Sequence, residues 1–234
     1  MVHSSLSAFG FVEGGADSMI DALFEAIGPR GTLVMPTLSF SWVGLGSPYD
    51  KRRTLSKVGA ITEAFRRRPG ALRSSHPTHS VAACGAKARF IVSGHSLDQP
   101  VFSKKGAYGK LYELDARILM MAPLGTNTIM HMAEELAGVP LPDFRAHVMR
   151  GRKRIEVTVK RAPWHANFED HYRVLFERGL IRSTALGEGK IHYMRARDAV
   201  DVACENVRRN PLMVTVEGCS CEFCQFVREK YKQT

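Results

Sequence analysis

Apolar residues recur along much of the chain at the spacing of amphipathic helices. Residues 14–31 show it most clearly, with Met19, Ile20, Leu23 and Phe24 on one face and Gly28-Pro29 as a stop. Similar patterns predict helices within residues 57–70, 86–94, 109–116 and 124–138.

Short apolar runs between these helices predict buried strands. One strand ends within "MVHSSL" at residues 1–6, and others are expected at residues 32–37, 79–85 and 117–123. The alternation of strands and helices predicts an α/β fold with a mainly parallel sheet covered by helices on both faces.

The pattern changes beyond residue 140. Residues 146–164 predict a β-hairpin turning at Gly151, residues 169–179 an amphipathic helix, and residues 190–211 a strand running into a helix. We therefore expect an α/β core at residues 1–140 and a smaller α+β portion at residues 141–234. One compact unit is as consistent with this pattern as two domains.

Composition and charge limit the classes of partner. The chain has 234 residues, 44% of them hydrophobic, and a net charge of +10. This charge favours anionic partners, but no aromatic-interleaved basic motif is present, so nucleic acid is not expected. No apolar stretch approaches the ~20 residues that span a bilayer, and no signal-peptide pattern is visible. We expect a cytoplasmic monomer or homodimer without a membrane partner.

Polar residues form three clusters next to the ends of predicted strands, where open α/β folds bind ligands. His3-Ser4-Ser5 precedes a glycine-containing turn and a helix, which suits a phosphate, although a capped turn is the alternative. The second cluster lies just before and at the start of the strand at residues 79–85. It consists of Arg73, Ser74, His76, His79 and Ser80.

The third cluster is the stretch "LGTNTIMHMAEELAG" at residues 124–138. With Thr126 or Asn127 as the N-cap, His131 lies near the first helical turn and Glu134 on the same face. A carboxylate there can orient an imidazole and stabilise its protonated form. A hydrogen-bonded core histidine is the alternative, while a metal pair is disfavoured because no third ligand is evident nearby.

In this order, the three clusters resemble the aminoglycoside N3-acetyltransferase family, an antibiotic acetyltransferase family distinct from the GNAT fold. The resemblance spans residues 2 to about 138. Its segments are "VHSSLSAFGFVEGG", "GTLVMP", "ITEAFRRRPGALRSSHPTHSVAACG", "KLYELDARILMM" and "NTIMHMAEE". Val2 enters the first motif almost at once, which indicates that an upstream segment of the family pattern is missing.

The resemblance implies acetyl-CoA as cosubstrate and transfer of its acetyl group to an amine. The family pattern places CoA against the residues that correspond to Ser4, Ser5, Leu6, Ser74, His76 and Ser80. His131 matches the family's histidine, with Glu134 as its neighbour. Asp98 in "HSLDQP" and Asp170 in "FEDHY" match acidic residues that would hold ammonium groups of the acceptor.

This assignment is chemically consistent. An acceptor amine must lose a proton before it attacks the thioester, and general-base catalysis by an imidazole contributes roughly 10²–10⁴-fold. Glu134 would orient His131, and Thr37 with nearby strand-end amides would stabilise the oxyanion. Attack would be direct, without an acyl-enzyme, because no serine lies in a nucleophile elbow.

The cysteines at the C-terminal end follow a CxCxxC pattern. Cys219, Cys221 and Cys224 could bind zinc with Cys204 as a fourth ligand, but the spacing lacks the usual paired CxxC knuckles. We therefore expect no metal and treat these three cysteines as the alternative metal candidates.

Two other functions stay open at this point. The same acetyl-CoA chemistry could serve a different amine, such as an amino sugar or a natural-product intermediate. A non-catalytic binding protein with a basic surface belongs to another class, and salt-dependent binding of nucleic acid without CoA binding would distinguish it.

Overall fold

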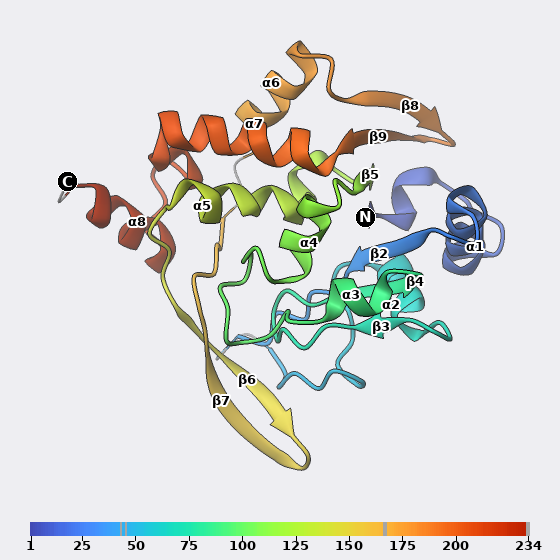
Figure 1. Ribbon diagram of the computed structural model, residues 1–234, viewed down its shortest axis with the longest axis horizontal. Helices are drawn as coiled ribbons and strands as arrows, with labels where there is room; N and C mark the ends of the chain where they lie inside the picture. The colour runs from blue at the N-terminus through green and yellow to red at the C-terminus, as the bar shows by residue number, and fades with distance from the viewer. Residues whose placement is uncertain (43, 45, 166–167, 233–234) are drawn as a thin grey trace.

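The computed structural model describes residues 1–42, 44, 46–165 and 168–232 (Figure 1). Its strands are β1 Val2–Ser4, β2 Thr32–Pro36, β3 Leu72–Arg73, β4 Val81–Gly85, β5 Arg117–Met121, β6 Phe144–Arg150, β7 Lys153–Val159, β8 Arg182–Leu186 and β9 Gly189–Arg195. Its helices are α1 Gly15–Ile27, α2 Ala60–Arg67, α3 Ala88–Val92, α4 Ala107–Glu113, α5 Met132–Ala137, α6 Glu169–Glu177, α7 Ala196–Arg209 and α8 Glu222–Lys232. Short 3₁₀ turns occupy Leu6–Phe9, Leu124–Thr126, Thr128–His131 and Pro211–Val214.

The strands form three hydrogen-bonded sheets, in the orders β1-β5-β9-β8, β2-β4-β3 and β6-β7. The fold is therefore mixed α/β, as expected, but the expected predominance of parallel strands needs correction. Among the described strand ladders, β1 and β5 pair in parallel, and all the others are antiparallel.

The correction has a local cause. The two-residue strand β3 precedes β4 with only a loop between them, so the pair is antiparallel and needs no helical crossover. Likewise, β9 returns beside β5 in the antiparallel direction after the C-terminal portion begins. An apolar run predicts a buried strand but carries no information about the direction of its neighbour.

Successive side chains of a strand point to opposite faces of its sheet, and the apolar interior accordingly forms two clusters. In β2, Val34 belongs to the first cluster, whereas Leu33 and Met35 belong to the second. Residues of α3, α4, α5 and α7 contribute to the first cluster, and residues of α1 and α2 to the second. The first cluster also contains Val159 and Val200, so it draws on residues from both sides of position 140.

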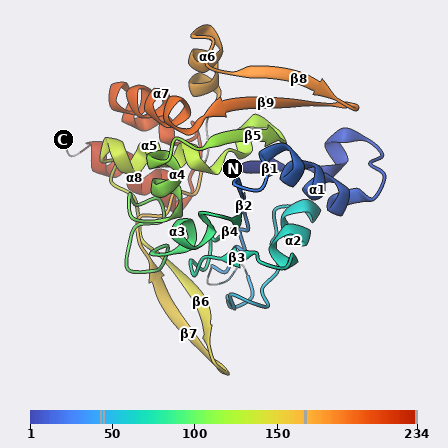
Figure 2. The same cartoon turned by 45° about the vertical axis from the view of Figure 1, so that its right-hand side comes forward.

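Several sequence predictions are confirmed. Helix α1 ends at Gly28, whose φ of 69° is in the left-handed region and whose N–H donates to the carbonyl oxygen of Phe24. Gly151, with φ of 61°, turns the β6–β7 hairpin, which projects from the rest of the molecule in both views (Figure 2). Strand β9 runs directly into α7.

The start of the α5 region differs from the expected single helix. The chain makes two 3₁₀ turns, and α5 begins only at Met132, directly after His131. Asn127 makes no side-chain capping bond, and the Thr126 hydroxyl donates to the carbonyl oxygen of Pro123 instead. Within the described ranges, no helix is long and apolar enough to cross a membrane.

Candidate active site

A cavity of about 850 Å³ opens at the carboxyl ends of the parallel strands β1 and β5. This is where ligands bind in open α/β sheets. Its walls come from the turn after β1, the segment after β5, the start of α2 and the chain before α6. The lining residues include Ser4, Ser5, Leu6, Thr62, His79, Thr126, Thr128, His131, Pro163, Trp164 and Phe168.

His131 and Glu134 form a hydrogen-bonded pair at this cavity. Nδ1 of His131 lies 2.8 Å from Oε1 of Glu134, and the ring of His131 lines the cavity. Glu134 is 3% exposed, and its Oε2 has no hydrogen-bond partner among the described residues. The 3₁₀ turn Thr128–His131 leads directly into α5, so positions 131 and 134 are adjacent on one face. The predicted pair is therefore present.

Aromatic rings surround the imidazole of His131. The ring centroids of Phe102 and Phe168 lie 5.3 and 5.0 Å from that of His131. A carboxylate and an imidazole with apolar neighbours interact more strongly than they would in water, because fewer water dipoles oppose their attraction.

Two further histidines line the cavity as neutral rings. Burial lowers the pKa of His79 to about 3, and the nearby His131 and His95 add to this effect. Burial also lowers the pKa of His3 to about 3, assisted by the charge of the terminal amine. At neutral pH these imidazoles carry no charge, so they add hydrogen-bonding groups without repelling a cationic amine.

Three residues expected to contact CoA lie at the cavity. Ser4, Ser5 and Leu6 all line it, at the point where β1 passes into a 3₁₀ turn. The Ser4 hydroxyl is buried and has no hydrogen-bond partner among the described residues. It is therefore free to pair with a bound molecule.

Four other residues expected at the site are buried elsewhere. Thr37, Ser74, His76 and Ser80 are each 0% exposed, and none of them lines the cavity. The Thr37 and Ser80 hydroxyls lie 3.1 Å apart, and the Ser74 hydroxyl accepts a hydrogen bond from the backbone N–H of Val81. The structure thus brings these four residues into a buried polar network.

This network holds the loop that carries His79. Arg73, which is 5% exposed, donates from Nε to the hydroxyls of Thr37 and Ser80. Nδ1 of His76 accepts from the backbone N–H of His79, and burial lowers the pKa of His76 well below its usual value. Of the two histidines that the sequence pattern singled out in this loop, His79 lines the cavity and His76 does not. The spacing of His76 and His79 in the sequence does not show which of them faces the cavity.

The two expected acceptor-binding aspartates are not brought to the cavity. Asp98 is exposed, with the Ser96 hydroxyl 3.4 Å from its carboxylate. Asp170 is exposed on α6 and pairs with Arg173 at 3.0 Å. None of the described residues that line the cavity is acidic.

The C-terminal cysteines gather around a residue that the sequence pattern did not indicate. Cys219, Cys221 and Cys224 lie beside His165, whereas the suggested fourth ligand, Cys204, is buried on α7 outside this group. His165 is separated from the cysteines by more than fifty positions, and no spacing rule connects them.

The fold and the site together define a class of protein: an enzyme with a mixed α/β fold. Its histidine–carboxylate pair lies at the wall of the cavity at the carboxyl ends of β1 and β5. Residues 1–208 match the family model for aminoglycoside 3-N-acetyltransferase. Aminoglycoside N(3)-acetyltransferase IV of Salmonella is 32% identical over 220 residues, which cover 91% of this chain and 82% of that protein. Aminoglycoside N(3)-acetyltransferase VII of Streptomyces paromomycinus is 30% identical and covers 86% and 82% of the two chains.

A solved structure supports the same assignment. The apoenzyme of aminoglycoside acetyltransferase AAC(3)-IVa superimposes with a TM-score of 0.81 at 30% identity, over 97% of this chain and 88% of that one. The chain belongs to the aminoglycoside 3-N-acetyltransferase family, whose members are acyltransferases. The family resemblance read from the sequence motifs is confirmed.

Proposed function

We propose that the chain transfers the acetyl group of acetyl-CoA to the 3-amino group of an aminoglycoside, with His131 as general base. One observation carries the proposal: the His131–Glu134 pair, 2.8 Å apart, stands at the wall of a cavity of about 850 Å³ that Ser4, Ser5 and Leu6 also line. A histidine-to-alanine variant of AAC(3)-IVa has been solved in complex with a gentamicin, which supports an aminoglycoside as the acceptor class.

The pair assigns a role to each imidazole nitrogen. Nδ1 of His131 bonds to Glu134, and Nε2 makes no hydrogen bond to any described residue. Nε2 is therefore the atom that removes a proton from the acceptor amine. The neutral amine, whose ammonium proton has already gone to solvent, forms a bond from its nitrogen to the acetyl carbon while Nε2 takes up the N–H proton. The carbon–sulfur bond breaks, and His131 gives that proton to the departing thiolate of CoA. The products are an amide and free CoA.

The turn after β1 is suited to the cosubstrate. Ser4 offers a hydroxyl without a hydrogen-bond partner among the described residues. Ser5 and Leu6 lie at the start of a 3₁₀ turn and line the same cavity. Acetyl-CoA would lie along this wall with its thioester toward His131. Thr37, Ser74, His76 and Ser80 then act on the site indirectly, by holding the loop of His79 in place.

A second acceptor is favoured by one observation. No described cavity residue is acidic, and Asp98 and Asp170 face solvent. A polycationic acceptor gains most from carboxylates that contact it directly, because a solvated aspartate at a distance is strongly screened. An amine with fewer positive charges, such as an amino sugar, is therefore the second candidate for the same chemistry.

The test is a thiol-release assay with acetyl-CoA and a panel of acceptors. Gentamicin and apramycin represent aminoglycosides, and glucosamine represents amino sugars with a single amine. Rapid release with the aminoglycosides supports the first acceptor, and release only with the single amine supports the second. His131→Ala is expected to lower kcat by about 10²–10⁴-fold.

A matched control separates the proposed base from a general effect of losing a histidine. His192 lies on β9 outside the cavity, and His192→Ala is expected to keep wild-type turnover. Wild-type turnover in the His131→Ala variant would reject His131 as the base. No thiol release with any amine, from folded protein that binds CoA, would reject the transferase activity itself.

A further inference from the structure

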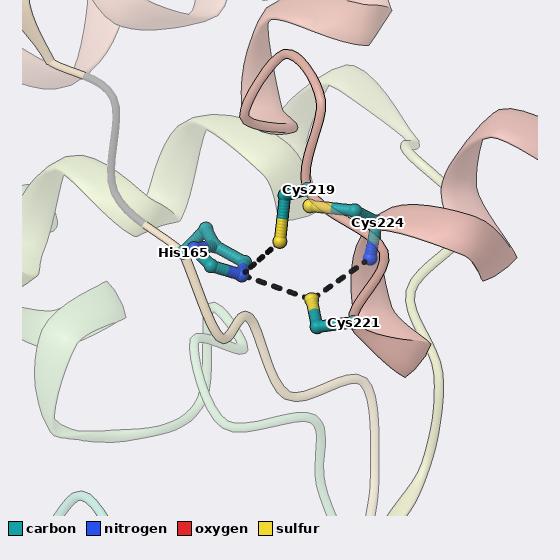
Figure 3. A group of neighbouring side chains, drawn as sticks. All are labelled: His165, Cys219, Cys221 and Cys224. Carbon is teal, nitrogen blue, oxygen red and sulfur yellow. Dashed lines mark hydrogen bonds between the residues drawn. The ribbon is translucent and has the colours of Figure 1, made fainter.

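Four potential metal ligands meet where the C-terminal cysteines lie beside His165 (Figure 3). They are one nitrogen of His165 and the sulfur atoms of Cys219, Cys221 and Cys224, and all four atoms lie within 4.8 Å of one another. Nε2 of His165 lies 2.9 Å from Sγ of Cys221 and 3.5 Å from Sγ of Cys219. All three cysteines are free thiols.

These distances fit a tetrahedral metal site with small adjustments. Zinc–sulfur bonds of about 2.3 Å and a zinc–nitrogen bond of about 2.0 Å place two sulfurs about 3.8 Å apart, and sulfur and nitrogen about 3.5 Å apart. The separation between His165 and Cys219 already agrees, and that between His165 and Cys221 needs to widen by less than an ångström.

The backbone around the cysteines is arranged as in a metal-binding knuckle. The N–H of Cys224 points to Sγ of Cys221 at 3.5 Å, and the N–H of Val216 points to Sγ of Cys224 at 3.5 Å. Such N–H donors stabilise negative charge on thiolates and orient them toward a metal. Cys224 is fully buried at the start of α8, a position where unligated thiolates would not be stable.

The charge of the surroundings also suits a zinc thiolate centre. Three thiolates, one neutral imidazole and Zn²⁺ carry a net charge of −1. Arg228 on α8 donates to the backbone carbonyl oxygens of Cys219 and Val216, so its guanidinium lies beside this centre and holds the cysteine turn against the helix. A set of three soft sulfur ligands and one imidazole selects zinc over hard cations such as magnesium and calcium.

We propose that His165, Cys219, Cys221 and Cys224 bind one Zn²⁺ ion in a closed structural site. Four protein ligands leave no open position for substrate, as in other structural zinc sites. The ion ties α8 to the segment before α6. Pro163, Trp164 and Phe168 of that segment line the cavity, so the zinc site fixes one wall of it without taking part in acetyl transfer. Binding releases one proton from each of the three thiols.

The test measures metal in the full chain, produced without a metal-binding tag and kept under reducing conditions. We expect about one zinc per chain by mass spectrometry of the elements. Replacing the zinc with Co²⁺ is expected to give the intense visible absorption of tetrahedral cobalt bound to thiolates. Cys221→Ser and His165→Gln are each expected to lose most of the metal.

Two matched controls address the loss of a cysteine or a histidine as such. Cys84 on β4 and His192 on β9 lie outside the group, and Cys84→Ser and His192→Gln are expected to keep the full zinc content. If a ligand variant does not fold, the wild-type chain provides the measurement. Removal of its zinc by a chelator is expected to lower Tm, and added Zn²⁺ is expected to restore it.

Three outcomes would overturn the proposal. Wild-type protein could contain no zinc and take up neither Zn²⁺ nor Co²⁺ when its thiols are reduced. The ligand variants could keep as much zinc as the controls. An intact mass lower by two hydrogens, without metal, would instead show a disulfide among the three cysteines. None of these readouts depends on acetyltransferase activity, so they test the zinc site separately from the proposed reaction.

Discussion

Glu134→Gln is the substitution that most directly tests the proposed base. It keeps the size of the side chain at position 134 and removes its negative charge. The carboxylate lies 2.8 Å from Nδ1 of His131 and is 3% exposed, so little water screens the pair. In the proposed reaction His131 becomes an imidazolium, and the carboxylate would stabilise that charge.

The expected loss follows from Coulomb's law. Two opposite charges with centres about 4 Å apart interact by about 4 kcal/mol at an effective dielectric constant of about 20. Losing this energy in the transition state corresponds to a decrease of about 10³-fold in kcat. A glutamine can also donate its amide N–H to Nδ1, which would favour the tautomer with the proton on Nε2. That tautomer cannot accept a proton from the amine.

The assay is steady-state thiol release at saturating acetyl-CoA, with the best acceptor from the panel. Glu135→Gln is the matched control, because Glu135 is the next residue on α5 and pairs with Arg161 at 2.9 Å instead of with His131. The control is expected to keep wild-type kcat. A Glu134→Gln variant with native Tm and a kcat within about threefold of wild type would refute the charge-pair reasoning.

Three further outcomes are expected. Phe65→Ala removes a ring that is 0% exposed in the second cluster, and it should lower the free energy of unfolding by about 3–5 kcal/mol. The measurement is the denaturation midpoint in urea, which should fall. The control Phe11→Ala, at a site that is 93% exposed, should change the free energy of unfolding by less than about 0.5 kcal/mol. Burial lowers the pKa of His171 to about 4, so the unfolded chain takes up the proton first as pH falls below 6.5. As pH falls from 6.5 to 4, His171 should therefore contribute a loss of about 1.4 kcal/mol of stability per pH unit. His171→Gln should reduce the slope measured by urea denaturation by about that amount, and an unchanged slope would contradict this. Ser5→Trp should fill the cavity beside the turn after β1 and raise KM for acetyl-CoA, and an unchanged KM would argue against cosubstrate binding there.

The sequence predicted most elements because their signals are local. Helix α1 follows from the spacing of its apolar residues, and the β6–β7 hairpin follows from Gly151. The His131–Glu134 pair was also predictable, since both residues lie within one turn of each other. The direction of the strands was not, because strand pairing depends on contacts between distant segments.

The same distinction explains where the structure places the expected site residues. His76 and His79 stand three positions apart in one loop, and only the packed structure decides that His76 stacks on His95 while His79 faces the cavity. His165 joins the cysteine group across more than fifty residues, which no spacing pattern contains. Contacts of this kind arise from tertiary packing.

The division of the apolar interior has a consequence for how this scaffold adapts. The cavity is bounded on one side by the turn of Leu6 and by α2, which adjoin the second cluster, and on the other by Phe168 of the first cluster. Exchanges of side chains on one side of the cavity therefore act first on the cluster that this side adjoins. Substitutions that change acceptor preference can thus accumulate on one side of the cavity at a time, and each perturbs folding stability mainly through the cluster that this side adjoins.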